Sequence, residues 1–252
     1  MQAKKDWRWA AASEIGTSHL RSYTPRQDAF CVSRLPNSGF VAVVSDGAGS
    51  ASHSRYGAVL VCRHFRTRLR HWFGDHVRFP SIDQFSEWLN ELRDQIAMVA
   101  KAQGLTSRQF ASTLVLVAVK GRSGFCAHVG DGGIVARSGG EWSVLSWPET
   151  GQFASTTYFV TDDREVHLRM LRFEAKFDAF ALFSDGIEDL ALVQSDLMAH
   201  RPFFDPMIRP VDIAKEGGRL SGLSLALQNY LAGEAVCNRT DDDKTLILLS
   251  RQ

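Results

Sequence analysis

The sequence predicts an α+β fold in which a central sandwich of β-sheets is covered by helices on both faces. Four short segments rich in Val, Leu and Phe are apolar at nearly every position, which is typical of strands buried on both faces. Two helical segments lie together between the first and second of these strands, so a strictly alternating, doubly wound sheet is disfavoured. The four predicted buried strands are residues 39–45, 112–119, 179–184 and 244–250.

Length and composition favour one domain. The chain has 252 residues, 44% of them hydrophobic, and no Pro/Gly/Ser-rich linker divides it, so we expect a single domain over residues 1–252. The net charge of +1 provides no general attraction to nucleic acid or to an anionic membrane. The amino terminus lacks the apolar stretch of a signal peptide, and no apolar run approaches the roughly 18 residues of a membrane span. We therefore expect a cytoplasmic protein that binds neither nucleic acid nor a membrane.

The cysteine pattern gives no sign of a zinc site or of a disulfide framework. The four cysteines are far apart in the sequence, and no C-x-x-C pair occurs. We expect reduced thiols, most of them buried.

The most regular helical pattern follows the first buried strand. Apolar residues recur every three or four positions from Ile82 to Val99, which indicates an amphipathic helix. Ser81 and Gln84 have the spacing of a capping box at its start, and Gly104 is expected to end it.

A second amphipathic helix is expected from about Tyr56 to Trp72. Arg63, Arg66 and Arg70 lie on its outer face, where a solvated basic surface is the preferred interpretation and a docking site for an acidic partner is the alternative. Further helices are expected over residues 187–198 and 222–232, and further strands over residues 124–130 and 141–147.

Acidic residues recur at the ends of the predicted strands. Each of the three Asp-Gly pairs, at Asp46, Asp131 and Asp185, ends an apolar run, and three acids at 241–243 precede the last one. A single Asp-Gly pair is most often only a chain reversal. Strands packed side by side deliver their ends to a common rim, however, so the recurrence predicts that these carboxylates converge.

Convergent carboxylates repel one another, and burial adds to the cost, so such a cluster requires protons or cations. Oxygen ligands without a matching His/Cys set select hard ions such as Mg²⁺, Mn²⁺ or Ca²⁺. A glycine after the aspartate allows close approach of the backbone, so the carbonyl of Gly47 is a candidate ligand. Two such ions activate water and hold a phosphoryl group for in-line attack, which points to phosphate ester hydrolysis.

The ordered set of motifs resembles the metal-dependent protein phosphatases of the protein phosphatase 2C type. The motifs are QDAF, VVSDGAGS, VGDGG, LFSDGIED and TDDDKTLILL, spread over nearly the whole chain, and the opening GTSH is similar to that of short, single-domain bacterial members. The resemblance implies a four-layer αββα sandwich with two central, mainly antiparallel sheets. It also implies two Mn²⁺ or Mg²⁺ ions and hydrolysis of phosphoserine and phosphothreonine in proteins by a metal-bridging water or hydroxide.

The resemblance also implies roles for individual residues. Asp46 would bridge both metals, and the Gly47 carbonyl would bind one of them. Asp185 and Asp242 would complete the ligands of the other metal, so that Asp46, Asp185 and Asp242 form the catalytic set. Asp28 would sit in or just outside the metal shell, holding coordinated waters.

A third, weaker metal is implied by one further acid. Asp131 matches the residue that binds this ion beside Asp185 in bacterial members. Here GDGG replaces the more usual GDSR, which removes polar groups near that acid.

Three more positions depart from the family pattern. Ala48 stands where many eukaryotic members have a histidine proposed as general acid, so the leaving alkoxide would take its proton from metal-bound water. Asp243 replaces the usual asparagine. Tyr23 stands at the spacing of the arginine that grips the substrate phosphate. The candidates to replace that arginine are His19, Arg21 and Arg26.

Other residues have competing interpretations. His53 is interpreted as a surface histidine and His128 as a core residue. For each of them this interpretation is preferred to a role in catalysis or metal binding. The segment 149–163 lies where family members carry a flap beside the active site. There Phe153 and Tyr158 either contact substrate or pack on the core.

Three functions explain the acids. A metal-dependent Ser/Thr phosphatase is favoured, because an idle acid cluster would only destabilise the fold. A catalytically silent module that binds a phosphorylated partner or regulates a kinase is the main alternative. A two-metal nuclease should bring a basic groove, which a net charge of +1 does not indicate. We expect a monomer that reverses the phosphorylation made by a Ser/Thr kinase in signalling.

Overall fold

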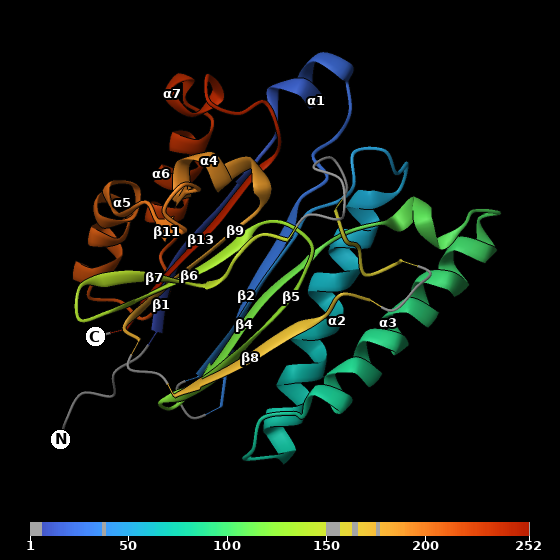
Figure 1. Ribbon diagram of the computed structural model, residues 1–252, viewed down its shortest axis with the longest axis horizontal. Coiled ribbons are helices and arrows are strands. Elements are labelled where there is room, and N and C mark those ends of the chain that lie inside the picture. Colours follow the sequence, from blue (N-terminus) through green and yellow to red (C-terminus); the bar gives the residue numbers. More distant parts are fainter. Residues whose placement is uncertain (1–6, 37–38, 150–156, 163–165, 175–176, 252) are drawn as a thin grey trace.

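Two β-sheets stack face to face and helices cover both outer faces, in a computed structural model (Figure 1). The structure describes residues 7–36, 39–149, 157–162, 166–174 and 177–251. The expected four-layer αββα sandwich is confirmed.

The first sheet has five strands in the order β2-β3-β4-β5-β8, all antiparallel. Its inner strands are buried at nearly every position because the partner sheet covers one face and helices cover the other. The strands are β2 (Ala29–Leu35), β3 (Gly39–Ser45), β4 (Leu114–Lys120), β5 (Ser123–Val129) and β8 (Arg169–Glu174).

The second sheet has six strands in the order β12-β1-β13-β9-β6-β7. All neighbours are antiparallel except β1 and β12. The strands are β1 (Trp7–Glu14), β6 (Gly133–Ser138), β7 (Glu141–Ser146), β9 (Ala179–Phe183), β12 (Gly218–Arg219) and β13 (Lys244–Arg251).

Three apolar clusters hold the layers together. Trp7, Phe40 and Phe180 belong to the cluster between the two sheets, and their rings lie 4.6–5.7 Å apart in tilted and edge-to-face contacts. Helices α2 (Ser54–Asp75) and α3 (Ile82–Ala102) close a second cluster on the five-stranded sheet. Helices α5 (Arg201–Ile213) and α6 (Ser221–Leu231) close a third on the six-stranded sheet. No helix in the described part of the chain is both long and apolar enough to cross a bilayer.

The two helices expected between the first strands are confirmed. The Oγ of Ser81 accepts a hydrogen bond from the backbone N–H of Gln84 at 3.1 Å, so Ser81 caps α3 as predicted. The reciprocal half of the capping box is absent among the described residues, since the Gln84 amide instead donates to Glu87. On α2, Arg63 and Arg70 are exposed.

One predicted helix is wrong. The segment 187–198 forms only the short helix α4 (Glu188–Ala191), which is followed by a small hairpin of β10 (Leu192–Val193) and β11 (Met198–Ala199). The chain turns extended at Leu192, and Leu197 has a positive φ of 53°, which ends any helical pattern. The helix expected over residues 222–232 is confirmed as α6.

The remaining elements are short. The four cysteines are free, as expected, but only two of them, Cys62 and Cys126, are buried. The elements are the helices α1 (Thr17–Ser22) and α7 (Glu234–Cys237) and the 3₁₀ turns η1 (Ser107–Phe110) and η2 (Asp185–Ile187).

The strand register brings the acidic strand ends to one rim of the sandwich. Ala29 pairs with Ser45, so Asp28 and Asp46 flank the same end of the β2–β3 pair. Leu246 pairs with Phe183, so the end of β9 lies beside the start of β13. The turns that carry Asp131, Asp185 and residues 241–243 therefore open toward the same side.

Candidate metal centre

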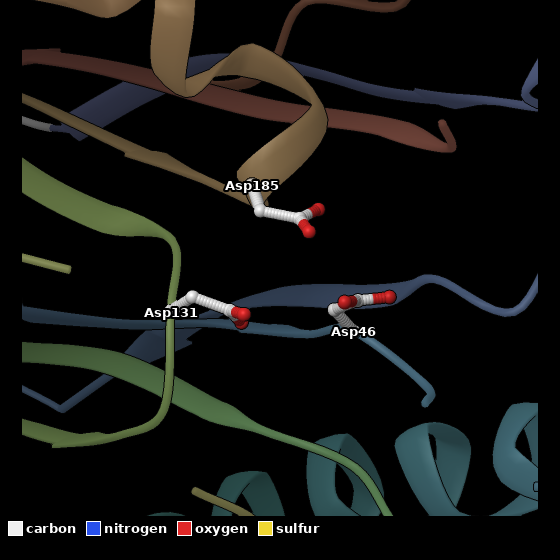
Figure 2. Close-up of side chains that lie close together, drawn as sticks. All are labelled: Asp46, Asp131 and Asp185. Carbon is white, nitrogen blue, oxygen red and sulfur yellow. The ribbon is translucent and has the colours of Figure 1, made fainter. Parts of the chain in front are cut away.

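Three aspartates from three different strand ends meet at this rim. Asp46 follows β3, Asp131 follows β5 and Asp185 follows β9, and each offers a carboxylate oxygen within 4.8 Å of the other two (Figure 2). The recurring Asp-Gly pairs are thus the residues that converge.

Asp46 is fixed by the start of the neighbouring strand. Its backbone N–H donates to Thr113 Oγ1 at 2.9 Å, and its carbonyl accepts from the Thr113 N–H at 2.8 Å. The hydroxyl of Ser45 donates to the Thr113 carbonyl at 2.6 Å. These bonds hold the end of β3 against the start of β4, so the backbone of Asp46 is held in place.

Asp185 opens the turn η2, which lies against the start of β13. A Cβ on Gly186 would lie 2.1 Å from the carbonyl oxygen of Asp243, so only glycine permits this approach. The N–H of Ser184 donates to the Thr245 carbonyl, and the N–H of Thr245 donates to Ser184 Oγ.

Asp131 projects from a tight turn between glycines. Gly130 and Gly132 have positive φ angles of 98° and 86°, a conformation that favours glycine. The hydroxyl of Thr157 donates to Asp131 Oδ2. The turn therefore places one carboxylate oxygen against Thr157 and leaves Oδ1 free of hydrogen-bond partners among the described residues.

Asp28 lies close to Asp46 and Asp185 of the cluster. Its side chain is buried, and its Oδ2 accepts hydrogen bonds from Ser184 Oγ at 2.7 Å and Thr245 Oγ1 at 2.6 Å. Its Oδ1 has no hydrogen-bond partner in the described part of the chain. Asp28 adds negative charge next to Asp46 and Asp185.

The two last acids of TDDDK occupy different places. Asp242 is exposed and lines the cavity above the cluster, near enough to raise the pKa of Asp185. Asp243 is buried and accepts hydrogen bonds from the N–H groups of Gly16 at 2.7 Å and Gln27 at 2.5 Å. Asp243 therefore joins the segment before Asp28 to the start of β13.

The electrostatics of the cluster suit divalent cations. Burial, and then repulsion by Asp185 and Asp28, raise the pKa of Asp46 well above its ordinary value. Burial, and then Asp131 and Asp242, do the same to the pKa of Asp185. Burial raises the pKa of Asp28 to about 6, although its hydrogen bonds oppose the shift.

Unpaired oxygens point to the same conclusion. The Oδ1 atoms of Asp28, Asp131 and Asp185 are buried without a hydrogen-bond partner among the described residues, which is costly unless something else binds them. An oxygen-only set of this kind fits Mn²⁺ or Mg²⁺.

A cavity of about 560 Å³ opens above the cluster. Of the three candidates for phosphate binding, His19 lines this cavity. Arg21 instead pairs with Asp241 at 2.8 Å, and Arg26 donates to the carbonyl of Ser13 at 2.6 Å, so neither lies on the cavity wall. The wall includes Ser18, Gln27, Gly47, Ala48, Arg108, Gln109, Thr157, Phe159, Thr161 and Asp162.

Arg108 is not among the site residues predicted from the sequence. It belongs to η1, a segment without apolar periodicity, and only the tertiary fold brings it to the cavity. No signal in the local sequence distinguishes it from the other arginines.

Two positions that depart from the family pattern, Ala48 and Tyr23, can be located in the structure. Ala48 is buried in a small apolar cluster with Ala51 and Ala111, so this position offers no proton donor. Tyr23 ends α1 in a left-handed conformation and is 96% exposed, outside the cavity.

The two ambiguous histidines lie outside the cluster. His53 packs on the ring of Phe110 and contacts the Ser52 hydroxyl. His128 is fully buried in β5, with Nδ1 2.7 Å from Ser146 Oγ, as expected of a core residue.

The predicted flap is described only in part. Phe153 lies outside the described residues. Tyr158 stacks on His167 at 3.8 Å and packs against the core under the five-stranded sheet. Its neighbours Thr157 and Phe159 are the ones that line the cavity.

Comparison with known proteins decides the family. The model of the family "Protein phosphatase 2C" matches residues 15–231. The chain belongs to the protein phosphatase 2C family. Serine/threonine-protein phosphatase 3 of Escherichia coli is 32% identical over 249 residues, which cover 96% of this chain and 97% of that protein. This phosphatase 2C member therefore matches a curated serine/threonine phosphatase over almost its full length.

Solved structures share the fold. PppA of Pseudomonas aeruginosa superposes with a TM-score of 0.66 at 18% identity, covering 98% of both chains. The catalytic domain of the serine/threonine protein phosphatase PstP, in complex with two manganese ions, gives a TM-score of 0.64 at 16% identity, covering 97% of this chain and 98% of that one.

Proposed function

We propose that the carboxylate cavity of this serine/threonine protein phosphatase hydrolyses phosphoserine and phosphothreonine with two divalent cations, Mn²⁺ or Mg²⁺. The observation that carries the proposal is the convergence of Asp46, Asp131 and Asp185, with buried oxygens left unpaired, at the floor of an open cavity. Such a cluster is costly without cations and is suited to binding them.

Within this proposal, the carboxylate of Asp46 and the carbonyl of Gly47 would hold the cations. Asp185 and the exposed Asp242 would complete the protein ligands of the second cation. Asp28, held by Ser184 and Thr245, orients water at the edge of the site.

Asp131 would be the additional acid that holds a weaker third ion. Its position within the same 4.8 Å cluster supports this role.

When bound, the cations lower the pKa of coordinated water and offset the charge on the phosphoryl group. The water oxygen forms a bond to phosphorus as the bond from phosphorus to the serine or threonine oxygen breaks, and a proton of that water passes to the departing oxygen, which leaves as the free hydroxyl. Ala48 has no proton to give, whereas His19 lines the cavity and lies beside the phosphate in this proposal.

The proposed substrate is a phosphorylated protein, and the enzyme reverses modification by a Ser/Thr kinase in cytoplasmic signalling. The openness of the cavity to the surface supports a side chain presented on a protein, since Asp242 and Arg108 on its wall are exposed. We further propose that residues 1–252 act as one catalytic domain and as a monomer, without binding nucleic acid or membrane.

The test is release of phosphate from a phosphothreonine peptide. Purified protein with Mn²⁺ is compared with the same protein in EDTA and with Asp46→Asn and Asp185→Asn. Asp75→Asn, at the exposed end of α2, is the matched control. We expect release that depends on Mn²⁺, is lost in both site variants and is retained in the control.

A folded wild type that binds Mn²⁺ and releases no phosphate would contradict this function. Such a result would favour the catalytically silent module that binds a phosphorylated partner.

A further inference from the structure

The wall of the cavity has a pronounced imbalance of charge. Among the described residues, the cavity is lined by five aspartates, at positions 46, 131, 162, 185 and 242, but by only one arginine or lysine, Arg108. The aspartates of the floor face cations in the proposed function. A phosphoryl group arriving from solvent meets one permanent positive charge from the protein, that of Arg108.

The turn η1, which carries Arg108, is held against the start of α2 and the residues before it. The carbonyl of its neighbour Gln109 accepts a hydrogen bond from the His53 N–H at 2.8 Å, and the Gln109 side chain accepts from the N–H and the hydroxyl of Ser52. A Cβ on Gly57 would lie 2.0 Å from the carbonyl oxygen of Phe110, so η1 lies directly on the start of α2.

The same turn is joined to the segment that carries Asp46. The N–H of Ala48 donates to the carbonyl of Ala111 at 3.0 Å, and Thr113 binds both backbone polar groups of Asp46. The loop after β3 and the turn that bears Arg108 are therefore joined by hydrogen bonds.

The guanidinium of Arg108 is available for a ligand. In the described part of the chain its side chain makes no hydrogen bond or ion pair, although acids line the same cavity. The other nearby arginines are engaged, Arg21 with Asp241 and Arg93 with the carbonyl of Asp162.

From these observations we infer that Arg108 binds the phosphoryl group of the substrate, in place of the arginine that is missing at Tyr23. The planar guanidinium presents two parallel N–H donors that match two phosphate oxygens, which a lysine does not. This inference rests on the proposed function for the identity of the substrate. It concerns the phosphate alone and not the rest of the phosphoprotein.

The experiment compares Arg108→Met and Arg108→Lys with the wild type and with Arg70→Met, which changes an exposed arginine of α2 that does not line the cavity. Titration calorimetry measures the Kd of inorganic phosphate for the Mn²⁺-loaded protein, and the Kd of Mn²⁺ for the metal-free protein. Steady-state kinetics measure KM and kcat for a phosphothreonine peptide and for p-nitrophenyl phosphate.

We expect Arg108→Met to weaken phosphate binding about tenfold, which corresponds to about 1.4 kcal/mol. KM should rise for the peptide and for the aryl phosphate alike, because both present the same group. Arg108→Lys should fall between Arg108→Met and the wild type. Arg70→Met should match the wild type, and the Kd of Mn²⁺ should be the same in all four proteins.

A phosphate Kd in Arg108→Met equal to that of the wild type overturns the inference. So does a weakened Mn²⁺ Kd in that variant, which would assign Arg108 to support of the metal cluster. If the wild type hydrolyses neither substrate, the proposed function fails, but the phosphate Kd still decides the role of Arg108. A wild type that binds no phosphate overturns the inference as well.

Discussion

The Nδ1 atom of His19 lies 3.0 Å from Oδ1 of Asp243, the acid that replaces the family's usual asparagine. Both oxygens of Asp243 accept hydrogen bonds from the backbone, Oδ1 from the Gly16 N–H and Oδ2 from the Gln27 N–H. This buried carboxylate therefore holds together the segment that carries His19 and the segment that leads into Asp28.

This arrangement predicts that Asp243→Asn destabilises the protein. An asparagine has one acceptor oxygen, and its NH₂ group would face an N–H donor, leaving a buried donor unpaired. We expect the free energy of unfolding to fall by about 1–3 kcal/mol, measured by urea denaturation. The exposed Asp75→Asn should change it by less than about 0.5 kcal/mol. Equal stability of Asp243→Asn and the wild type would show that the asparagine finds a satisfactory alternative.

The metal cluster predicts that Asp46→Asn is more stable than the wild type without metal and less stable than the wild type with Mn²⁺. In EDTA the variant should be more stable than the wild type, because it removes a buried carboxylate whose pKa is raised by burial and by Asp185 and Asp28. Removing this charge relieves both the burial cost and the repulsion, so the free energy of unfolding of the variant should be higher than that of the wild type. Urea denaturation without metal measures it, and a less stable variant would contradict the expectation.

Mn²⁺ should reverse that order. At about 100 times its Kd a ligand that binds only the folded state stabilises it by about 2.7 kcal/mol. The wild type should gain this amount and Asp46→Asn little of it. A variant that gains as much as the wild type would exclude Asp46 as a ligand.

Parts of the fold were predictable because their burial pattern is simple. Strands such as β3 and β13 are covered on both faces, so nearly every position is apolar. Strand β1 escaped prediction because it mixes small residues with Arg8, which is buried and donates to the carbonyl of Ala214. Helix α5 escaped because Pro206 and Pro210 interrupt its pattern, and packing against the sheet overrides their low propensity.

The candidate site was also predictable only in part. The convergence of the Asp-Gly pairs followed from strand ends sharing a rim, which is a property of sheets in general. Arg108 was not predictable, because its position depends on contacts of Gln109 and Ala111 with a loop some 60 residues earlier in the chain, and no local pattern encodes such contacts.

His128 predicts acid sensitivity of the fold. Burial lowers its pKa to about 3, with Arg169 adding to the effect, whereas an unfolded histidine titrates near 6.5. The unfolded chain therefore binds a proton that the folded protein refuses, so stability is lost as the pH falls from about 6.5 toward 3 and is fully present above 6.5. Between pH 7 and pH 5 the titration of His128 alone lowers the free energy of unfolding by about 2 kcal/mol.

The measurement is urea denaturation of the wild type and of His128→Gln at pH 7 and pH 5. The variant is expected to be less stable at pH 7, because it loses the contacts of His128 with Ser146 and Arg169, but to lose about 2 kcal/mol less on acidification. The same pH dependence in both proteins would assign the acid sensitivity to other groups.

Gly186 predicts that a single methyl group next to Asp185 damages both stability and activity. A Cβ there would lie 2.1 Å from the Asp243 carbonyl oxygen, which belongs to the backbone, so η2 must move away from β13 and carry Asp185 with it. We expect Gly186→Ala to cost about 1–3 kcal/mol of unfolding free energy and to weaken Mn²⁺ binding. Gly222→Ala is the matched control, since nothing lies within 4 Å of its added Cβ in helix α6, and it should stabilise by about 0.5–1 kcal/mol. Urea denaturation and Mn²⁺ calorimetry on both variants test the pair. A Gly186→Ala protein with unchanged stability and unchanged Mn²⁺ affinity would mean that η2 does not need its close contact with β13 to hold Asp185 in the cluster.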